Sequence, residues 1–166
     1  MAQAVPIKHV VIVGGGFAGV RCAQDLARSG KVRVTLVDRH NYQQFKPLFY
    51  QVATSELTAR DVGFSLRNIF RKSPNVDIKL GDVSTINPAL CSVGTKEGQT
   101  YQGDFLVLAA GAQANFFNTP GAEANSLPLY SLTDAERLRS RILAVFEDAD
   151  REPKLIEQGA LNFVIV

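Results

Sequence analysis

The 166-residue sequence has no tryptophan, one methionine and only two cysteines, Cys22 and Cys91. Neither cysteine belongs to a close pair, which excludes a dithiol motif that shuttles electrons and a cysteine cluster that holds a metal. No basic N-terminal region precedes a long apolar stretch, and no run approaches the about 18 apolar residues that cross a bilayer. We therefore expect a cytoplasmic protein with reduced thiols.

The charge balance is also close to neutral. The formal net charge is +2, with 46% hydrophobic and 20% charged residues, which is ordinary for a globular domain. The basic residues in two expected helices alternate with apolar ones, which favours solvated helix faces over a nucleic-acid-binding surface. These residues are Arg67, Arg71, Lys72, Arg137, Arg139 and Arg141.

A glycine-rich segment follows the first apolar run. Val10-Val11-Ile12-Val13 leads directly into Gly14-Gly15-Gly16-Phe17-Ala18-Gly19. This predicts a strand, a tight loop and a helix start, the unit that binds a dinucleotide pyrophosphate. Gly14 would allow the turn, Gly16 the approach of backbone to phosphate, and Gly19 close packing of helix on strand. The alternative is a glycine-rich turn that binds no ligand.

The residues after the loop favour the dinucleotide interpretation. Residues 18–29 keep helical spacing until Gly30, and residues 32–37 then predict a second strand that ends at Asp38. An acidic residue about 20 residues after the motif binds ribose hydroxyls in such folds. A carboxylate there also disfavours a 2′-phosphate, because the two anions would repel each other.

The next segments predict a loop and a helix. Residues 41–54 are rich in aromatic and amide side chains and show little periodicity, which is typical of a functional loop and would suit the edge of a planar group. The alternative is that these aromatics simply cover the end of the sheet. A helix is expected around residues 56–72, with Val62, Leu66, Ile69 and Phe70 on one face.

Strand patterns resume at residue 76. Alternation predicts a strand from Val76 to Val83, and the runs 91–95 and 100–101 predict a small antiparallel hairpin laid over the parallel sheet. The continuous apolar run 105–109 predicts a central parallel strand that is buried on both faces. It ends in Ala110-Gly111-Ala112, small residues that would let a cofactor pass close to the backbone.

The last quarter of the sequence predicts a linker and a new unit. Residues 118–130 are rich in turn formers, and Thr133 with Glu136 predicts a capping box for a helix. That helix would bury Leu138, Ile142, Val145, Phe146 and Ala149. Residues 162–166 repeat the pattern of residues 9–13 and predict a strand. We therefore expect an N-terminal fragment: residues 1–117 in a first dinucleotide-binding domain, a linker at 118–130, and the start of a second domain at 131–166.

In this order, the motifs resemble the two-dinucleotide-binding-domain flavoproteins and, within them, the type II NADH dehydrogenases. The most specific segments are Val11 to Gly19, Phe45 to Thr54, Gly81-Asp82-Val83, and Leu108 to Ala112 with Asn115-Phe116-Phe117. The resemblance covers essentially the whole chain. It implies an α/β, Rossmann-like FAD-binding domain with a parallel sheet, helices and a small antiparallel layer.

The resemblance also implies the cofactor contacts. FAD would lie along Gly14, Gly16, Phe17, Ala18 and Gly19, with Asp38 and Arg39 at the adenosine ribose and the Val83 backbone at the adenine. Gln51 and Thr54 would approach the flavin, and Ala110 and Gly111 the pyrophosphate and ribityl region. The family usually has Ala-Thr-Gly where this chain has Ala109-Ala110-Gly111, so a side-chain hydroxyl is missing here.

The implied activity is electron transfer from NADH through FAD to quinone. The chain alone would be inactive, no residue is assigned a catalytic role, and no metal is expected. The full protein would act on the inner face of the cytoplasmic membrane through a C-terminal part and could form a homodimer. Two alternatives stay open: an FAD reductase that serves ferredoxin or a soluble acceptor, and a non-catalytic adenine-nucleotide-binding module. Disulfide reductases and sulfide-oxidising relatives fit less well because they need cysteines that this sequence lacks.

Overall fold

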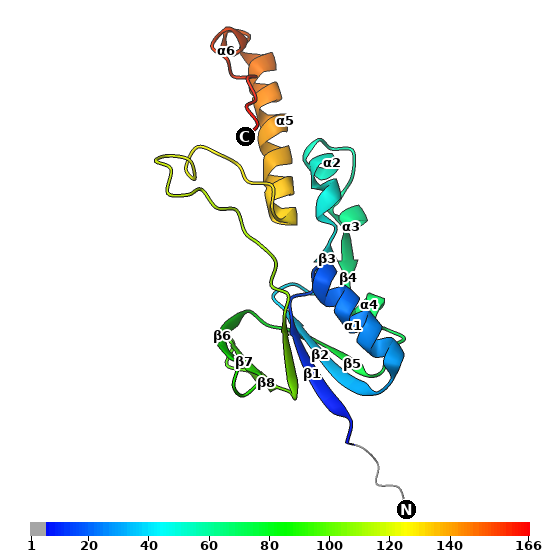
Figure 1. The fold of residues 1–166 in the computed structure, drawn as a ribbon. Helices are drawn as coiled ribbons and strands as arrows, with labels where there is room; N and C mark the ends of the chain where they lie inside the picture. The colour runs from blue at the N-terminus through cyan, green and yellow to red at the C-terminus, as the bar shows by residue number, and fades with distance from the viewer. Residues whose placement is uncertain (1–5) are drawn as a thin grey trace, which may run out of the picture. The chain divides into compact units, whose positions relative to one another are not determined.

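The computed structural model describes residues 6–166, which pack as two units (Figure 1). Unit 1 contains residues 6–44 and Phe64–Ala112. Unit 2 contains Phe45–Gly63 and Gln113–Val166. Each unit therefore draws on two separate stretches of the sequence.

A four-stranded parallel sheet forms the centre of unit 1. Its order is β5-β2-β1-β9, where β1 is Lys8–Val13, β2 is Val32–Asp38, β5 is Val76–Leu80 and β9 is Phe105–Leu108. Val13 lies in register with Val37 of β2 and Leu108 of β9, so the carboxyl ends of three neighbouring strands meet at one edge. Ligands of open α/β sheets bind at this edge.

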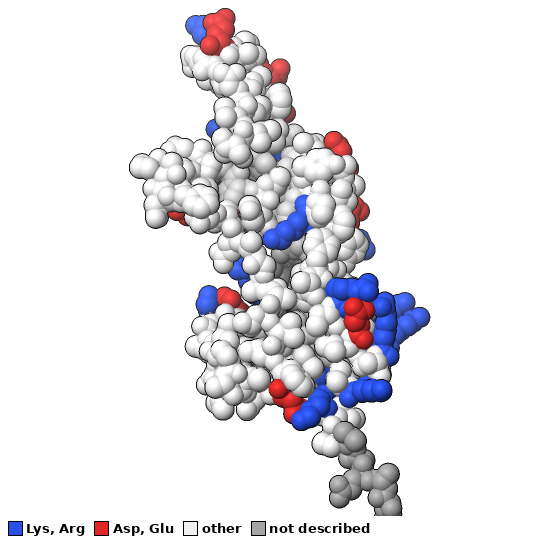
Figure 2. Space-filling model, viewed as in Figure 1, with Lys and Arg blue, Asp and Glu red and all other residues white. Residues whose placement is uncertain are grey.

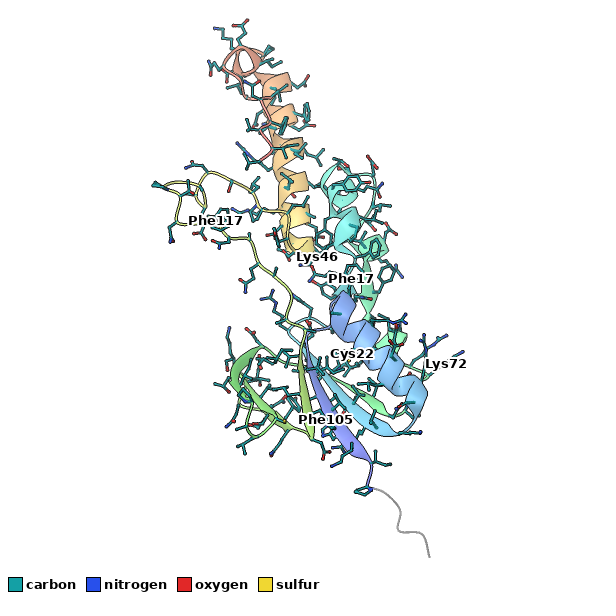
Figure 3. The ribbon with its side chains drawn as sticks, viewed as in Figure 1. Phe17, Cys22, Lys46, Lys72, Phe105 and Phe117 are labelled. Carbon is teal, nitrogen blue, oxygen red and sulfur yellow. The ribbon has the colours of Figure 1, made fainter. Side chains whose placement is uncertain are left out.

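Both faces of the central strands are buried, which explains their continuous apolar sequences. Alternate residues of β1 and β2 pack on one face with α1 (Phe17–Ser29) and α4 (Leu66–Ile69). The intervening residues face a second cluster that contains Val93. The first cluster consists of Val10, Ile12, Val20, Ala23, Val34, Leu36, Leu66, Phe70 and Ile78, and the second of Val11, Val13, Val37 and Val93. Cys22 lies on α1, packs against the first cluster and is a free thiol (Figure 3).

A three-stranded antiparallel sheet completes unit 1. It consists of β6 (Val83–Asn87), β7 (Ser92–Thr95) and β8 (Thr100–Gln102). The predicted hairpin is confirmed as β7 and β8. Strand β6 was not predicted from the sequence. The expected strand from Val76 to Val83 is interrupted: β5 ends at Leu80, just before Gly81, and a new strand that pairs with β7 begins at Val83.

The prediction of a central, doubly buried strand at 105–109 is wrong for the described residues. β9 pairs with β1 alone and forms an edge of the sheet. Phe105 and Leu108 are 56% and 55% exposed, which a strand buried on both faces would not show. An apolar run indicates that a strand can be buried on both faces. Whether the strand lies in the centre of the sheet or at its edge depends on the strand order.

The single helix predicted around residues 56–72 is also wrong. The structure has α3 (Ala59–Val62), β4 (Gly63–Ser65) and α4. A capping box of Thr58 and Asp61 begins α3, the extended Gly63 ends it, and Ser65 caps α4. Because β4 pairs with β3 (Tyr42–Gln44), backbone pairing interrupts a pattern that has helical spacing.

Unit 2 is helical. The segment predicted as a loop at 41–54 includes η1 (Lys46–Leu48) and α2 (Phe49–Ala53), and α2 packs against α5 (Leu132–Arg151). Phe49 is 1% exposed, so this ring serves the core of unit 2 and offers no flat surface to a ligand. Arg139 Nε donates to Ser55 Oγ at 3.0 Å, and Lys46 Nζ lies 5.5 Å from the centre of the Tyr130 ring.

Three expectations for the C-terminal stretch need correction. The capping box of α5 is formed by Ser131 and Asp134, two residues before the predicted Thr133 and Glu136, because Ser131 is the extended residue that precedes the helix. Leu132, Ala135, Val145 and Ala149 are buried in this helix, whereas Phe146 is 51% exposed. Residues 162–166 form no strand and follow the short helix α6 (Lys154–Glu157), since no described strand pairs with them.

Candidate functional site

The turn after β1 requires glycine at its first position. Gly14 has φ +105°, and its N–H donates to Val37 O at 2.8 Å. A Cβ on Gly14 would lie 2.2 Å from Ala109 O and 3.2 Å from Ala110 Cα. The turn therefore brings the glycine loop against the segment that follows β9, and the chain's own packing explains Gly14.

The fourth glycine of the loop is also explained by packing. A Cβ on Gly19 would lie 1.8 Å from Gly14 O and 3.4 Å from the Ile12 side chain. No side chain fits there, so α1 lies directly on the turn. This close approach fixes where the N-terminus of α1 points.

Gly16 differs from both, because nothing in the chain requires it. Its φ is −79°, it is exposed, and no atom lies within 4 Å of the position that a Cβ would take. It is the N-cap of α1, and the first turn of that helix holds no acidic residue. No side chain caps this N-terminus by a hydrogen bond from the Gly16 position, and the positive end of a 13-residue helix fits a bound anion. Phe17 and Ala18 are also exposed at this helix start (Figure 3).

Asp38 joins the end of β2 to the glycine loop. Its Oδ2 accepts the Gly15 N–H at 2.5 Å, and its Oδ1 accepts the His40 N–H at 2.6 Å. A carboxylate has about four acceptor sites, so each oxygen retains capacity for a further hydroxyl. The two internal bonds fix the carboxylate beside the loop, as required of a group that would bind ribose.

The turn between β5 and β6 lies next to Asp38. The Gly81 N–H donates to Asp38 O at 2.9 Å, and Val83 begins β6 in register with Thr95. Lys96 Nζ forms an ion pair with Asp82 Oδ2 at 2.6 Å. This hydrogen-bonded pair lowers the pKa of Asp82, and the charges of Arg39 and His40 lower it further.

The structure thus brings most of the predicted site residues together in unit 1. Gly14, Gly19, Asp38 and Ala110 are linked by the contacts above, and Gly16, Phe17 and Ala18 stand at the same loop. Gly111 follows Ala110, is exposed, and has φ +75°, which favours glycine. Arg39 is exposed and lies close enough to Asp82 to affect its pKa.

Two predicted residues belong to unit 2. Gln51 lies in α2, where its carbonyl accepts the Glu56 and Leu57 N–H groups. Thr54 is the C-cap of α2, and its Oγ1 donates to Tyr50 O at 3.0 Å. Both have structural roles in a helix end, and their contact with flavin stays a prediction.

Several residues of the site were missed from the sequence. A Cβ on Gly15 would lie 2.7 Å from Leu66 Cδ1, so the middle glycine makes room for the core. His40 supplies the second N–H to Asp38, an interaction that the Asp-x-His spacing could have indicated. Lys96 and Glu97 contact Asp82 although they lie 14 and 15 residues further along the sequence. No local sequence pattern predicts such contacts.

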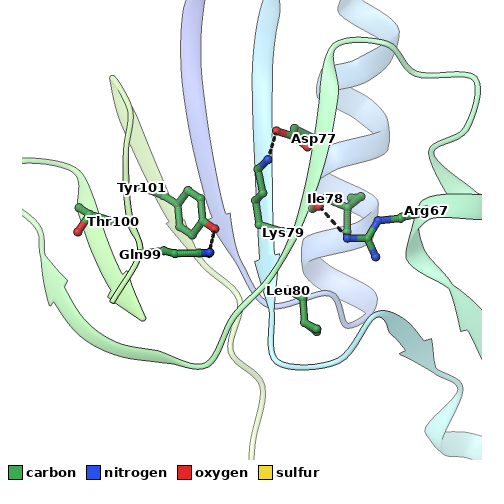
Figure 4. Close-up of a pocket in the computed structure, with 8 residues that line it drawn as sticks. All are labelled: Arg67, Asp77, Ile78, Lys79, Leu80, Gln99, Thr100 and Tyr101. Atoms are coloured by element: carbon green, nitrogen blue, oxygen red, sulfur yellow. Dashed lines mark hydrogen bonds and ion pairs between the residues drawn. The ribbon is translucent and has the colours of Figure 1, made fainter. Parts of the chain in front are cut away.

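A cavity of about 710 Å³ lies elsewhere in unit 1, along the outer edge of β5 (Figure 4). Its polar groups are engaged with each other: Lys79 pairs with Asp77 at 2.8 Å, and Arg67 donates to Ile78 O at 3.5 Å. No residue of the glycine loop lines it. The cavity therefore adds nothing to the candidate site.

Basic side chains gather on the α1 side of unit 1, with acidic ones among them (Figure 2). Arg21 and Arg28 both pair with Asp25, at 2.9 and 3.0 Å. Among residues 6–166, no three acidic, histidine or cysteine side chains gather as metal ligands would. No helix in the same range has the length and apolar character needed to cross a membrane.

Comparison with known proteins gives consistent matches. The profile of a family described as pyridine nucleotide-disulphide oxidoreductase matches residues 8–155. The type II NADH:quinone oxidoreductase Ndh of Mycobacterium tuberculosis is 39% identical over 150 residues, which are 88% of this chain and 32% of that protein. The mitochondrial external alternative NAD(P)H-ubiquinone oxidoreductase B2 of Arabidopsis thaliana is 35% identical over 96% of this chain and 29% of its own length.

A solved structure agrees with these matches. The sulfide:quinone oxidoreductase of Aquifex aeolicus superposes with a TM-score of 0.77 and 26% identity, covering 84% of this chain and 32% of that one. The chain thus spans about a third of the length of the relatives it matches. The α/β fold with a parallel sheet is confirmed.

Proposed function

Because the chain belongs to the pyridine nucleotide-disulphide oxidoreductase family, we propose that it forms the FAD-binding part of a flavin-dependent NADH dehydrogenase. In this proposal electrons pass from NADH through FAD to quinone. The names of the Mycobacterium and Arabidopsis relatives support NADH and quinone as substrates. Because the chain spans about a third of those proteins, donor and acceptor are proposed for the longer protein.

The observation that carries the proposal is the contrast among the loop glycines. Gly14 and Gly19 are required by contacts within the chain, whereas the space beside Gly16 is open and Gly16 is exposed. Packing within the chain does not explain this glycine at the N-terminus of a helix. Its presence therefore supports the proposal that the phosphates of a ligand approach the backbone there.

The residues present fit FAD at this site. Gly16, Phe17 and Ala18 would hold the pyrophosphate at the positive end of α1. Asp38 would accept ribose hydroxyls with the acceptor capacity that Gly15 and His40 leave, with Arg39 next to it. Val83 would meet the adenine through its backbone, and Ala110 and Gly111 would flank the pyrophosphate and ribityl chain. Contact through the backbone at Ala110 and Gly111 needs no side-chain donor. Ala110 can therefore take this role without the threonine hydroxyl that the family usually has.

When bound, a flavin supplies the redox chemistry that accepts a hydride from nicotinamide and passes electrons to quinone. The chain's own groups bind and orient. No acid or base is required for the hydride step, so we assign no catalytic residue. The proposed flavin contacts of Gln51 and Thr54, attachment to the inner face of the cytoplasmic membrane, and a homodimer are further predictions for the longer protein.

Titration with FAD, followed by flavin fluorescence, tests the proposal. We expect saturable binding to the wild-type chain, weaker binding to Gly16→Val and Asp38→Ala, and unchanged binding to Lys79→Ala, a charged residue outside the site. A folded wild-type chain that bound ADP and NAD⁺ as tightly as FAD would instead support the adenine-nucleotide module. A chain that bound none of the three would contradict the proposed site.

A further inference from the structure

The tip of the β7–β8 hairpin contacts the turn that follows β5. Lys96 Nζ lies 2.6 Å from Asp82 Oδ2, and the Lys96 N–H donates to Asp82 O at 2.9 Å. Side chain and backbone of one residue therefore bind side chain and backbone of the other. This double contact fixes the distance between hairpin and turn.

Glu97 closes the same contact from the other side. The Asp82 N–H is 3.2 and 3.4 Å from the two carboxylate oxygens of Glu97. The pKa of Glu97 is lowered first by a hydrogen bond from its own backbone N–H, then by the Thr95 hydroxyl and by the Asp82 N–H. Thr95 is 7% exposed, and a Cβ on Gly81 would lie 2.8 Å from its Cγ2. The hairpin tip thus fits closely over the turn, where a side chain on Gly81 would press on the buried Thr95.

The contacts continue from the turn to the glycine loop. The Gly81 N–H donates to Asp38 O, and the Asp38 carboxylate accepts the Gly15 N–H. Each step along this path joins residues that are adjacent in the sequence or hydrogen-bonded within unit 1. A displacement of the hairpin tip would therefore reach Asp38 through one turn.

We propose that Lys96 and Glu97 are positioning residues for the adenosine end of the bound dinucleotide. By holding Asp82, they fix the turn from Gly81 to Val83 beside Asp38, so that adenine and ribose meet a preorganised surface. The inference rests on the proposed function, because it needs a dinucleotide at Asp38. It adds residues outside the glycine motif and Asp38, the acidic residue that ends β2.

The exposure of the pair separates positioning from folding. The side chains of Lys96 and Asp82 are 65% and 37% exposed, and an exposed ion pair contributes little to stability. Lys79 and Asp77 provide a matched control in the same unit, with 2.8 Å between charges and exposures of 40% and 56%. Loss of the control pair removes a similar ion pair, whereas the contacts of Lys96 and Glu97 with the turn at Asp82 remain.

The test compares Lys96→Ala, Glu97→Ala and the control Lys79→Ala by two measurements on the full 166-residue chain. Amide hydrogen exchange without ligand should show faster exchange at Asp82 and Gly81 in the first two variants alone. Their affinity for FAD and for ADP should fall about two- to fivefold relative to Lys79→Ala. Lys96→Arg and Glu97→Gln, which keep a donor and an acceptor, should restore part of the affinity.

The outcomes separate this inference from the proposed function. Faster exchange with unchanged FAD and ADP affinity would overturn the inference and leave the hairpin with a structural role only. An equal loss of affinity in Lys79→Ala would overturn it as well. The lower affinity would then follow from the loss of any positive charge in unit 1, not from the contact with Asp82. A wild-type chain that bound neither ligand would overturn the proposed function and the inference with it, whatever the exchange rates.

Discussion

The carboxylate of Asp38 accepts the backbone N–H of Gly15, 23 residues away in the sequence, at 2.5 Å. The acidic residue at the end of β2 therefore helps to hold the glycine loop before it meets any ligand. A group expected only to bind ribose has a second role in the architecture of its own site. The two roles can be separated by substitution.

Asp38→Ala should destabilise the chain, because the Gly15 and His40 N–H groups both lose their acceptor. We expect a loss of about 1–3 kcal/mol in the free energy of unfolding, measured by urea denaturation. Asp38→Asn keeps one acceptor oxygen and should lose less stability than Asp38→Ala. Equal stability of wild type and Asp38→Ala would show that the two bonds contribute nothing to folding.

The loop glycines should divide into two classes. Gly14→Ala and Gly19→Ala should each lose about 2 kcal/mol or more, because the new Cβ meets backbone atoms in both cases. Gly16→Ala should unfold as the wild type does and yet bind FAD more weakly, since its Cβ enters open space. Thermal unfolding and FAD titration of the same samples measure both properties. Wild-type FAD affinity in folded Gly16→Ala would argue against phosphate contact at this position.

The N-terminus of α5 offers a test of its cap. Ser131→Ala should cost about 1 kcal/mol, because the Asp134 N–H then loses the Ser131 Oγ acceptor. Thr133→Ala should change stability by less than about 0.5 kcal/mol, because Thr133 is exposed and takes no part in the capping box. Urea unfolding of the two single variants decides the matter. A larger loss in Thr133→Ala would restore the box predicted from the sequence.

His9 should make stability depend on pH. Burial and the neighbouring Arg33 lower the pKa of His9 below 6.5, outweighing the opposing effects of a hydrogen bond with the Gln102 backbone and of Asp104. Its Nε2 lies 2.9 Å from Thr35 Oγ1 and its Nδ1 3.2 Å from Arg33 Nη2, which can only donate. The unfolded chain therefore binds the proton more readily than the folded one, and stability should fall as pH drops below 6.5 towards the folded pKa.

Urea unfolding between about pH 7.5 and about pH 5 measures this effect. The window lies above the ordinary pKa values of 3.8 and 4.5 of the carboxylates whose pKa values are lowered, so their loss of stability comes later. His9→Gln should flatten the profile in this window. An unchanged slope in His9→Gln would assign the pH dependence to another group.

The sequence alone determined the local units around the glycine loop. β1, α1 and β2 agree with the prediction within a few residues, because continuous apolar runs, helical spacing and Gly30 at φ +62° are encoded by neighbouring residues. Asp38, Gly14 and Gly19 could likewise be assigned from spacing. The close helix–strand contact at Gly19 and the turn at Gly14 need glycine wherever this unit forms.

The tertiary structure decided what depends on partners distant in the sequence. Strand order places the apolar β9 at a sheet edge, and pairing of β3 with β4 breaks a stretch that has helical spacing. The contact of Lys96 and Glu97 with Asp82 and the burial of Phe49 within unit 2 also depend on residues that are distant in the sequence. Residues 162–166 have a strand-like sequence and no strand, because a strand exists only where another chain segment accepts and donates its hydrogen bonds.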